Sequence, residues 1–156
     1  MKLTSKGDSD APAEFVWAKM SDYEAWERAI RKRNTVLERS PGPIAPGTTW
    51  NAKFRLRGRA RDMVVTLVSE TPGHRIHLTV ADPTIDVDIV IELLTLTPAR
   101  SRVVTALDLR PRNLTARLLV QSLRLARSKV QDQLDKRVEG WMLHVADQYR
   151  TQSRPA

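Results

Sequence analysis

The sequence predicts an α+β fold in which a seven-stranded antiparallel sheet wraps around one long C-terminal helix. Between residues 35 and 109, segments of alternating apolar and polar residues are separated by turn residues roughly every 10–15 positions, which is typical of an antiparallel meander. From residue 115 to residue 149, apolar side chains instead recur every three or four positions, which indicates one face of a helix. An antiparallel sheet with one apolar face needs a cover, and this helix can supply it.

The N-terminal segment is predicted to contain a strand and then two short helices. Weak alternation of apolar and polar residues over positions 1–7 predicts the strand. Asp10 is placed to cap the first helix, and Pro12 is placed in its first turn. Ser21 and Glu24 have the spacing of a capping box, which predicts the start of the second helix. The apolar face of that second helix carries Tyr23, Trp26 and Ile30.

Six further strands are predicted before the C-terminal helix: residues 35–39, 48–57, 60–70, 75–81, 86–93 and 102–109. In the second of these, Trp50 and Phe54 share one face, and Lys53 and Arg55 share the other. The third has apolar residues on both faces, so the sequence does not decide which of its faces points towards the core. A twisted sheet of this size curls, so a single helix laid across it leaves a space that side chains or a ligand must fill.

Composition places the chain among ordinary globular domains. Its 156 residues are 41% hydrophobic and 28% charged, and we expect one domain over residues 1–150, followed by a frayed tail over residues 151–156. The absence of cysteine excludes disulfide scaffolds, thiolate metal sites and cysteine nucleophiles. No apolar run reaches the length of a membrane span and no signal-peptide pattern opens the chain, which predicts a cytoplasmic location.

Motifs for nucleophilic catalysis and for cofactor binding are absent from the sequence. There is no G-x-S-x-G for a hydrolase nucleophile and no Gly-rich phosphate-binding motif for a nucleotide. His77 alternates away from the apolar positions of its strand, and His74 is predicted at the opposite end of the sheet from Asp82 and Asp86. Because a metal site needs three or four converging ligands, we expect neither a metal nor a cofactor.

Several short segments carry a resemblance to a known family. They are residues 11–17 (APAEFVW) with Asp22 and Trp26, Pro41-Gly42 with Gly47 and Trp50, residues 54–61 (FRLRGRAR), and residues 108–111 (DLRP) running into the helix. On these residues the chain resembles the START-like (SRPBCC) superfamily, in particular its polyketide cyclase/dehydrase-like and lipid-transport members. The resemblance implies a helix-grip fold whose cavity binds lipids, polyketides, isoprenoids or similar molecules. Some members are enzymes and many are carriers.

We therefore predict binding or transport of a hydrophobic or amphipathic small molecule between the sheet and the C-terminal helix. The predicted lining residues are Trp26, Trp50, Phe54, Ile76, Leu78, Leu107, Leu119 and Leu123. The alternative for these large side chains is an ordinary packed core. A second hypothesis is a polyketide-type cyclase or dehydratase in the same pocket, which needs only one or two acid–base groups near the substrate. Candidates for those groups are Tyr23, Thr105, Asp62 and Thr66.

Arginines are predicted to gather at one end of the sheet, because alternate connections of a meander lie at the same end. That end collects Arg57, Arg59, Arg61, Arg110 and Arg112, with Asp82 and Asp86 nearby. We predict that Arg57, Arg59 and Arg110 border the cavity mouth and hold an anionic head group, since a guanidinium binds carboxylate or phosphate in bidentate fashion. The alternative is that these arginines are solvated or paired with acidic neighbours.

The net charge is +8, from 26 Lys and Arg against 18 Asp and Glu. A basic protein can attract larger anionic partners such as nucleic acid or an anionic membrane surface. Lys53, Arg55 and Arg57 form a basic stripe on the predicted outer face of the sheet, but no aromatic residue alternates with them. Base stacking requires such exposed aromatic rings, so the sequence disfavours nucleic acid as a partner. Weak contact with an anionic membrane surface would suit a carrier of amphipathic cargo better.

Overall fold

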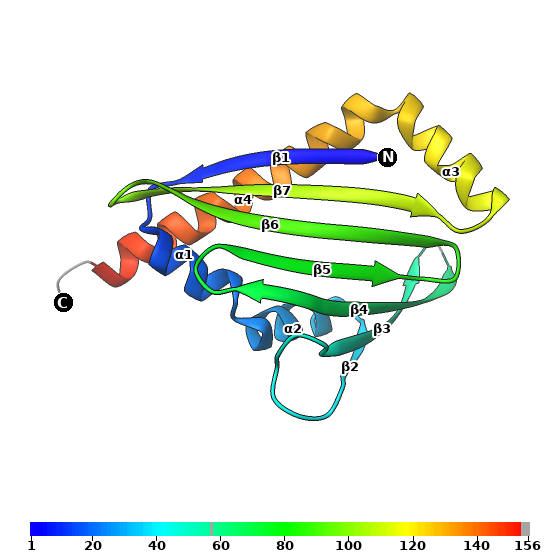
Figure 1. The fold of residues 1–156 in the computed structure, drawn as a ribbon, viewed down its shortest axis with the longest axis horizontal. Coiled ribbons are helices and arrows are strands. Elements are labelled where there is room, and N and C mark those ends of the chain that lie inside the picture. Colours follow the sequence, from blue (N-terminus) through cyan, green and yellow to red (C-terminus); the bar gives the residue numbers. More distant parts are fainter. Residues whose placement is uncertain (57, 154–156) are drawn as a thin grey trace.

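Seven antiparallel strands form one sheet, and helices α1, α2 and α4 lie against one of its faces (Figure 1). The computed structural model describes residues 1–56 and 58–153. The elements are β1 (Lys2–Ser9), α1 (Ala13–Met20), α2 (Tyr23–Arg31), β2 (Val36–Arg39), β3 (Thr49–Leu56), β4 (Arg59–Thr71), β5 (Arg75–Ala81), β6 (Ile85–Thr97), β7 (Arg100–Pro111), α3 (Leu114–Leu125) and α4 (Arg127–Ser153). The predicted α+β helix-grip fold is confirmed.

The strand order in the sheet is β1-β7-β6-β5-β4-β3-β2, with antiparallel pairing throughout. Strands β2 to β7 therefore form the predicted meander, and β1 closes the far edge against β7. Because β1 and β2 lie at opposite edges of the sheet, the chain between them must cross its whole width. Helices α1 and α2 make that crossing on one face of the sheet (Figure 1).

The inner face of the sheet is set by alternation along each strand. The sequence does not decide which face of β4 points inward. In the structure, Leu67 is fully buried, and Val64 and Val68 are exposed. A β-bulge between Leu67 and Ser69 then shifts the register, so that Leu67 pairs with Leu78 and Glu70 pairs with Ile76. The bulge therefore turns Glu70 towards the same inner face as Leu67, three residues earlier.

Helix α4 packs chiefly on β1, whose inward residues are mostly small. The Ser5 hydroxyl donates to Asp135 Oδ1 at 2.6 Å, and the Ser9 hydroxyl donates to the Met142 carbonyl at 2.8 Å. Between them, a Cβ placed on Gly7 would lie 2.9 Å from Val138 Cγ1, closer than real contacts allow. Small residues on β1 thus let the helix backbone approach the edge of the sheet directly.

The single C-terminal helix predicted over residues 115–149 is wrong in one respect, because the chain bends at Ala126. Ala126 has φ −99° and ψ 23° and ends α3, and α4 starts at the next residue. Figure 1 shows α3 directed away from α4 at the end of the sheet. The apolar spacing continues across Ala126, so periodicity does not reveal the bend. Helix α4 continues through Ser153, and residues 154–156 of the predicted tail lie outside the described residues.

The predicted caps of the two short helices are also wrong. Pro12 occupies the N-cap position of α1, and Asp10 instead forms an ion pair with Arg100 at 2.9 Å. Asp22 caps α2 by accepting a hydrogen bond from the Ala25 N–H at 3.1 Å. The Ser21 hydroxyl donates backwards to the carbonyl at the end of α1. Aspartate and serine are comparable caps, so local propensity did not discriminate between neighbouring positions.

We expect Gly7→Ala to lower the free energy of unfolding by about 1–3 kcal/mol, because the added methyl group overpacks the β1–α4 contact. Gly140→Ala is the matched control: the site lies within α4 and a Cβ there meets no atom within 4 Å. That control should stabilise the protein by about 0.5–1 kcal/mol through helix propensity alone. Urea denaturation measures both, and equal effects of the two substitutions would contradict the proposed close approach.

Candidate functional site

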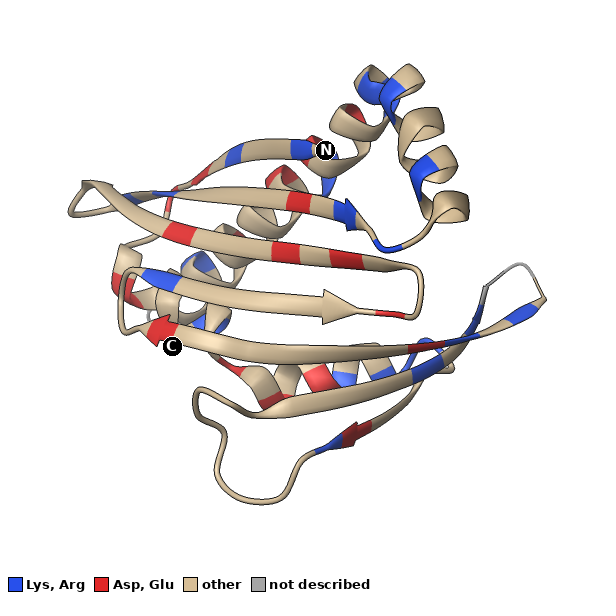
Figure 2. Ribbon diagram, turned by 45° about the vertical axis from the view of Figure 1, so that its right-hand side comes forward, with Lys and Arg blue, Asp and Glu red and all other residues tan. Residues whose placement is uncertain are grey.

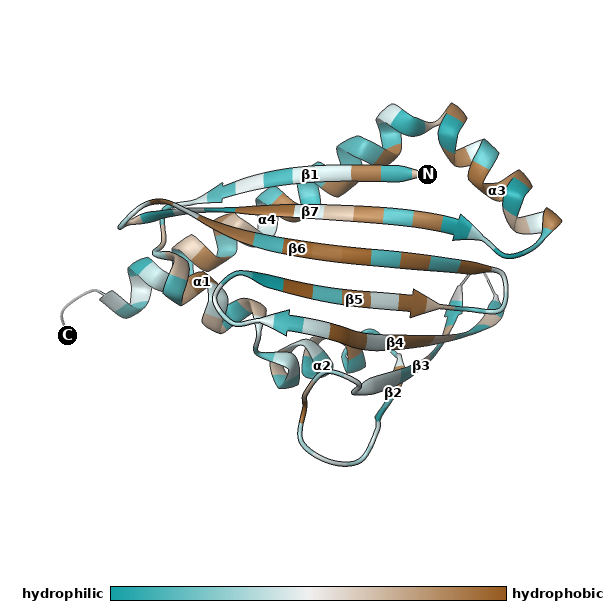
Figure 3. Cartoon of the chain, viewed as in Figure 1, coloured by the Kyte–Doolittle hydropathy of each residue, from teal (hydrophilic) through white to brown (hydrophobic). Residues whose placement is uncertain are grey.

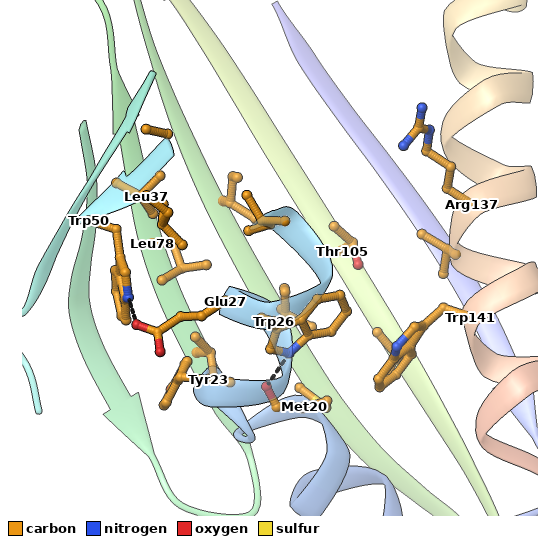
Figure 4. Close-up of a pocket in the computed structure, with 18 residues that line it drawn as sticks. Met20, Tyr23, Trp26, Glu27, Leu37, Trp50, Leu78, Thr105, Arg137 and Trp141 are labelled. Atoms are coloured by element: carbon orange, nitrogen blue, oxygen red, sulfur yellow. Dashed lines mark hydrogen bonds between the residues drawn. The ribbon is translucent and has the colours of Figure 1, made fainter. Parts of the chain in front are cut away.

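A cavity of about 410 Å³ lies between the inner face of the sheet and helices α2 and α4 (Figure 4). Most of its lining is apolar: Met20, Trp26, Ile30, Leu37, Trp50, Ala52, Val65, Ile76, Leu78, Ile89, Ile91, Val103, Val138 and Trp141. Four polar side chains complete it: Tyr23, Glu27, Thr105 and Arg137. The volume and the mixture of a large apolar wall with few polar groups are typical of small-molecule sites.

The hollow exists because the helices cover the two ends of the sheet unequally. Near the start of β7, Val16 of α1 and Met142 and Val145 of α4 are fully buried in the same apolar core. Further along the sheet, α4 stays over β1 and α2 stays near β2 and β3, so the middle strands between them lack a covering side chain. Trp26 and Ile30 of α2 and Arg137 of α4 line the cavity and are also solvent-exposed. The opening therefore lies between these two helices.

Two tryptophans connect the helices at this opening. The rings of Trp26 on α2 and Trp141 on α4 stack with centroids 5.9 Å apart and an interplanar angle of 27°. The Trp26 indole N–H also donates to the Met20 carbonyl at 3.1 Å, which orients the ring towards Trp141 (Figure 4). Stacked aromatic pairs add stabilisation beyond the area they bury. The pair joins α2 to α4, and both rings form part of the cavity wall.

Glu27 places a buried carboxylate in the cavity wall. Its side chain is 7% exposed, accepts a hydrogen bond from the Trp50 indole N–H at 2.8 Å, and forms an ion pair with Arg39 at 3.4 Å. A carboxylate offers about four acceptor positions, so these two partners leave capacity for a ligand. The sequence analysis did not identify Glu27. The available signal was its spacing, since Glu27 follows Tyr23 by four residues and shares its helix face.

Two hydroxyl groups also reach the cavity. The Tyr23 hydroxyl donates to Glu70 Oε1 at 3.1 Å, a partner that the β4 bulge turns inward. Burial raises the pKa of Tyr23, and the charge of Glu70 and its hydrogen bond raise it further, so the phenol is neutral at pH 7. Thr105 is buried on β7, and none of the hydrogen bonds within residues 1–56 and 58–153 involves its hydroxyl. It is therefore available to a ligand.

Four of the eight predicted lining residues border the cavity: Trp26, Trp50, Ile76 and Leu78. Phe54 and Leu107 lie further along their strands and do not reach it. Leu119 and Leu123 belong to α3, which the bend at Ala126 directs away from the cavity. Their predicted place in the cavity followed from the apolar spacing that continues from α3 into α4 as if they were one helix.

Among the four side chains considered for acid–base chemistry, Tyr23 and Thr105 line the cavity and Asp62 and Thr66 do not. Asp62 is exposed to solvent. Thr66 alternates with the inward Val65 and Leu67, so it lies on the outer face of β4. Because Val65 and Leu67 are on the inner face of β4, Asp62 and Thr66 are on its outer face and cannot reach the cavity.

Two arginines of the predicted cluster, Arg110 and Arg112, are paired with acidic groups on the outer face of the sheet. Arg110 pairs with Asp88, which also contacts His77 Nε2 at 3.2 Å, and Arg112 pairs with Asp86 at 2.9 Å. Figure 2 shows these acidic residues along β6 beside the basic end of β7. For Arg110 and Arg112 the structure thus shows the paired alternative. Neither Arg59 nor Arg110 lines the cavity, and Arg57 lies outside the described residues.

The turn between β5 and β6 is held by Asp82. Its Oδ1 accepts hydrogen bonds from the Thr84 N–H at 2.7 Å, the Thr84 hydroxyl at 2.8 Å and the Ile85 N–H at 2.8 Å. Burial acts to raise the pKa of this carboxyl, but these hydrogen bonds and the nearby charge of Arg61 outweigh burial and lower the pKa. Asp82 therefore has a structural role in the turn.

Comparison with known proteins identifies relatives of this fold. A family model described as "Polyketide cyclase / dehydrase and lipid transport" matches residues 1–139. No curated protein matches the chain.

Several solved structures share the architecture. The Zhui aromatase/cyclase from Streptomyces sp. R1128 is 15% identical, with 99% of this chain and 96% of that chain covered and a TM-score of 0.64. Norcoclaurine synthase from Thalictrum flavum, in complex with dopamine and hydroxybenzaldehyde, is 10% identical, with 100% and 89% covered and a TM-score of 0.64. A START superfamily protein from Mycobacterium smegmatis is 12% identical, with 85% and 95% covered and a TM-score of 0.52. At these identities the likeness concerns the fold.

We expect Glu27→Ala to lower the free energy of unfolding by about 1–3 kcal/mol, because it leaves the buried Trp50 N–H without an acceptor. Glu27→Gln retains an acceptor oxygen and should cost less than half as much. Exposed Glu38→Ala on β2 is the control, with an expected change within about 0.5 kcal/mol. Urea denaturation would contradict this role for Glu27 if the Ala and Gln variants were equally destabilised.

Proposed function

The chain belongs to the polyketide cyclase/dehydrase and lipid transport family, and from this premise we propose that it binds or transports a hydrophobic or amphipathic small molecule. This membership confirms the START-like resemblance of the sequence. The observation that carries the proposal is the cavity of about 410 Å³, whose wall is apolar except for four side chains. A lipid, polyketide or isoprenoid-type ligand would bury its apolar surface there. The cytoplasmic location stays a prediction from sequence.

Polar groups in the wall support a more specific ligand class. The carboxylate of Glu27 is an acceptor, and the Thr105 hydroxyl lies on the opposite side of the cavity and can donate or accept (Figure 4). A ligand with a hydroxyl or similar donor could use the acceptor positions of Glu27 that Trp50 and Arg39 leave free. A polar group near β7 would give the buried Thr105 hydroxyl a partner, and because an unpaired buried polar group is costly, such a ligand would be preferred over a hydrocarbon of the same size.

An anionic group on the ligand would bind at the opening of the cavity rather than inside it. Arg137 is the one basic side chain among the described residues that line the cavity, and it is exposed where α4 borders the opening. Glu27 lies deeper and would repel a second carboxylate. An amphipathic ligand with a negative head would therefore direct that head towards Arg137 and its apolar part towards the sheet. This role differs from the one predicted for Arg59 and Arg110, which do not line the cavity, and the prediction for Arg57 stays untested.

We expect Ile89→Trp to weaken binding of the neutral fluorescent probe N-phenyl-1-naphthylamine by about tenfold or more, because the larger side chain fills the cavity. Val90→Trp, on the outer face of the same strand, is the matched control and should leave affinity within about twofold. Fluorescence titration measures both variants. Native mass spectrometry of freshly purified protein would show whether a lipid-like mass is retained. Equal affinity of the two variants for the probe would contradict binding in this cavity.

A second candidate function, a polyketide-type cyclase or dehydratase, is favoured by Tyr23 and Glu27, which lie one turn apart on α2 and both line the cavity. An aldol cyclisation with loss of water needs a base to remove a proton from carbon and an acid to protonate the departing hydroxyl. Glu27 could supply the base, and the neutral Tyr23 phenol could supply the proton.

If this second function holds, Tyr23→Phe should lower the turnover of a linear aromatic polyketide by about 100-fold or more, while probe affinity changes little. Product formation followed by chromatography measures turnover, and fluorescence titration measures affinity. Thr66→Val, on the outer face of β4, is the control for general effects of losing a hydroxyl. Absence of turnover by the wild-type protein on such substrates would leave binding or transport as the function.

A further inference from the structure

Helix α3 presents an exposed leucine face that neither the cavity nor the core uses. The helix lies at the end of the sheet and packs only its Ala116 and Val120 side, which is buried (Figure 1). Leu114, Leu118 and Leu125 are 71%, 58% and 93% exposed, respectively. Figure 3 shows hydrophobic positions along the projecting helix α3.

The exposed leucines form a single stripe. At about 100° per residue, Leu114, Leu118 and Leu125 fall within about 40° of one another around the helix axis. Ala116 and Val120 fall on the opposite side, about 140–180° from the middle of the stripe. The leucine stripe, defined as Leu114, Leu118 and Leu125, therefore points directly away from the protein. A row of exposed apolar side chains along one helix face is typical of an interaction site, and Gln121 is the polar residue on this face.

Charge identifies the kind of surface that this stripe fits. From residue 109 to residue 131 the chain contains no Asp or Glu, and its basic residues there are Arg110, Arg112, Arg117, Arg124, Arg127 and Lys129. Arg117 and Arg124 lie about 80–100° from the stripe along one side of α3. Figure 2 shows basic residues without acidic ones on α3. Within the described part of the chain, Arg117, Arg124 and Lys129 form no ion pair.

We propose that α3 docks on the surface of an anionic lipid bilayer, with the leucine stripe at the boundary between head groups and acyl chains. An apolar stripe flanked by arginine is the pattern of a helix lying in the plane of a membrane interface. The long arginine side chains can extend from the helix towards phosphate groups while the leucines insert. This inference goes beyond ligand binding and is independent of it. It assigns the site at which a carrier would meet the membrane that holds its cargo.

Among the helices of residues 1–56 and 58–153, none is long and apolar enough to cross a membrane.

Vesicle flotation tests the proposal, with the full chain and vesicles of phosphatidylcholine containing 30% phosphatidylglycerol. The wild-type protein should float with these vesicles and not with pure phosphatidylcholine. The double variant L118S/L125S should lose about tenfold or more in affinity, because it removes two apolar anchors from exposed positions. Leu143→Ser, at a 65% exposed position on α4, is the matched control and should bind like the wild type. Arg117→Gln and Arg124→Gln should each weaken binding about fivefold at low salt.

Three results would overturn the inference: no flotation of the wild-type protein, equal flotation with neutral vesicles, or unchanged flotation of L118S/L125S. A dimer in analytical ultracentrifugation that L118S/L125S converts to monomer would also overturn it, because the stripe would then join two copies of this chain. N-phenyl-1-naphthylamine titration of L118S/L125S separates the two proposals. Unchanged probe binding with lost flotation supports membrane docking at α3 and leaves the cavity proposal intact.

Discussion

The packing of α4 against β1 determines the rest of the molecule. Because Ser5, Gly7 and Ser9 are small, the helix rests directly on the edge strand and is held there by two serine hydrogen bonds. A helix fixed at one edge cannot also cover the middle of the sheet. The inner faces of β5 and β6 therefore line the cavity, because α2 lies near the opposite edge of the sheet. The distance between these two helices is what keeps a cavity open in a domain that otherwise has a solid core.

The cavity is bounded by contacts that serve both stability and binding. Stacking of Trp26 on Trp141 joins α2 to α4 at the opening, and the hydrogen bond from Trp50 to Glu27 joins α2 to β3. Each contact also presents a group to the cavity: an aromatic ring in the first case and a carboxylate in the second. These contacts already hold the lining side chains in place. A ligand would therefore lose little free energy to ordering them when it binds.

The candidate site was partly predictable from local pattern. Trp50, Ile76 and Leu78 are inward positions of alternating strands, and Trp26 follows from helical spacing, so sequence alone placed them on the cavity side. Glu27 was missed because a charged residue on an otherwise apolar helix face is normally assigned to solvent. Its partners, Trp50 and Arg39, come from other elements and are adjacent only after folding. Arg110 was placed at a rim, but the register of β6 and β7 sets it opposite Asp86, and its guanidinium pairs with the neighbouring Asp88.

By itself the sequence determined the seven strands, their meander order, the two short helices and the helical character of residues 115–149, because these depend on periodicities of two and 3.6 residues that are local to each segment. Tertiary structure decided the facing of β4, the bend at Ala126 and the pairing of the arginines. Each of these depends on contacts between segments far apart in the chain, such as the bulge opposite β5 that turns Glu70 to Tyr23. Whether a hollow remains under the helix was likewise a tertiary outcome, since it follows from how closely α4 approaches Gly7.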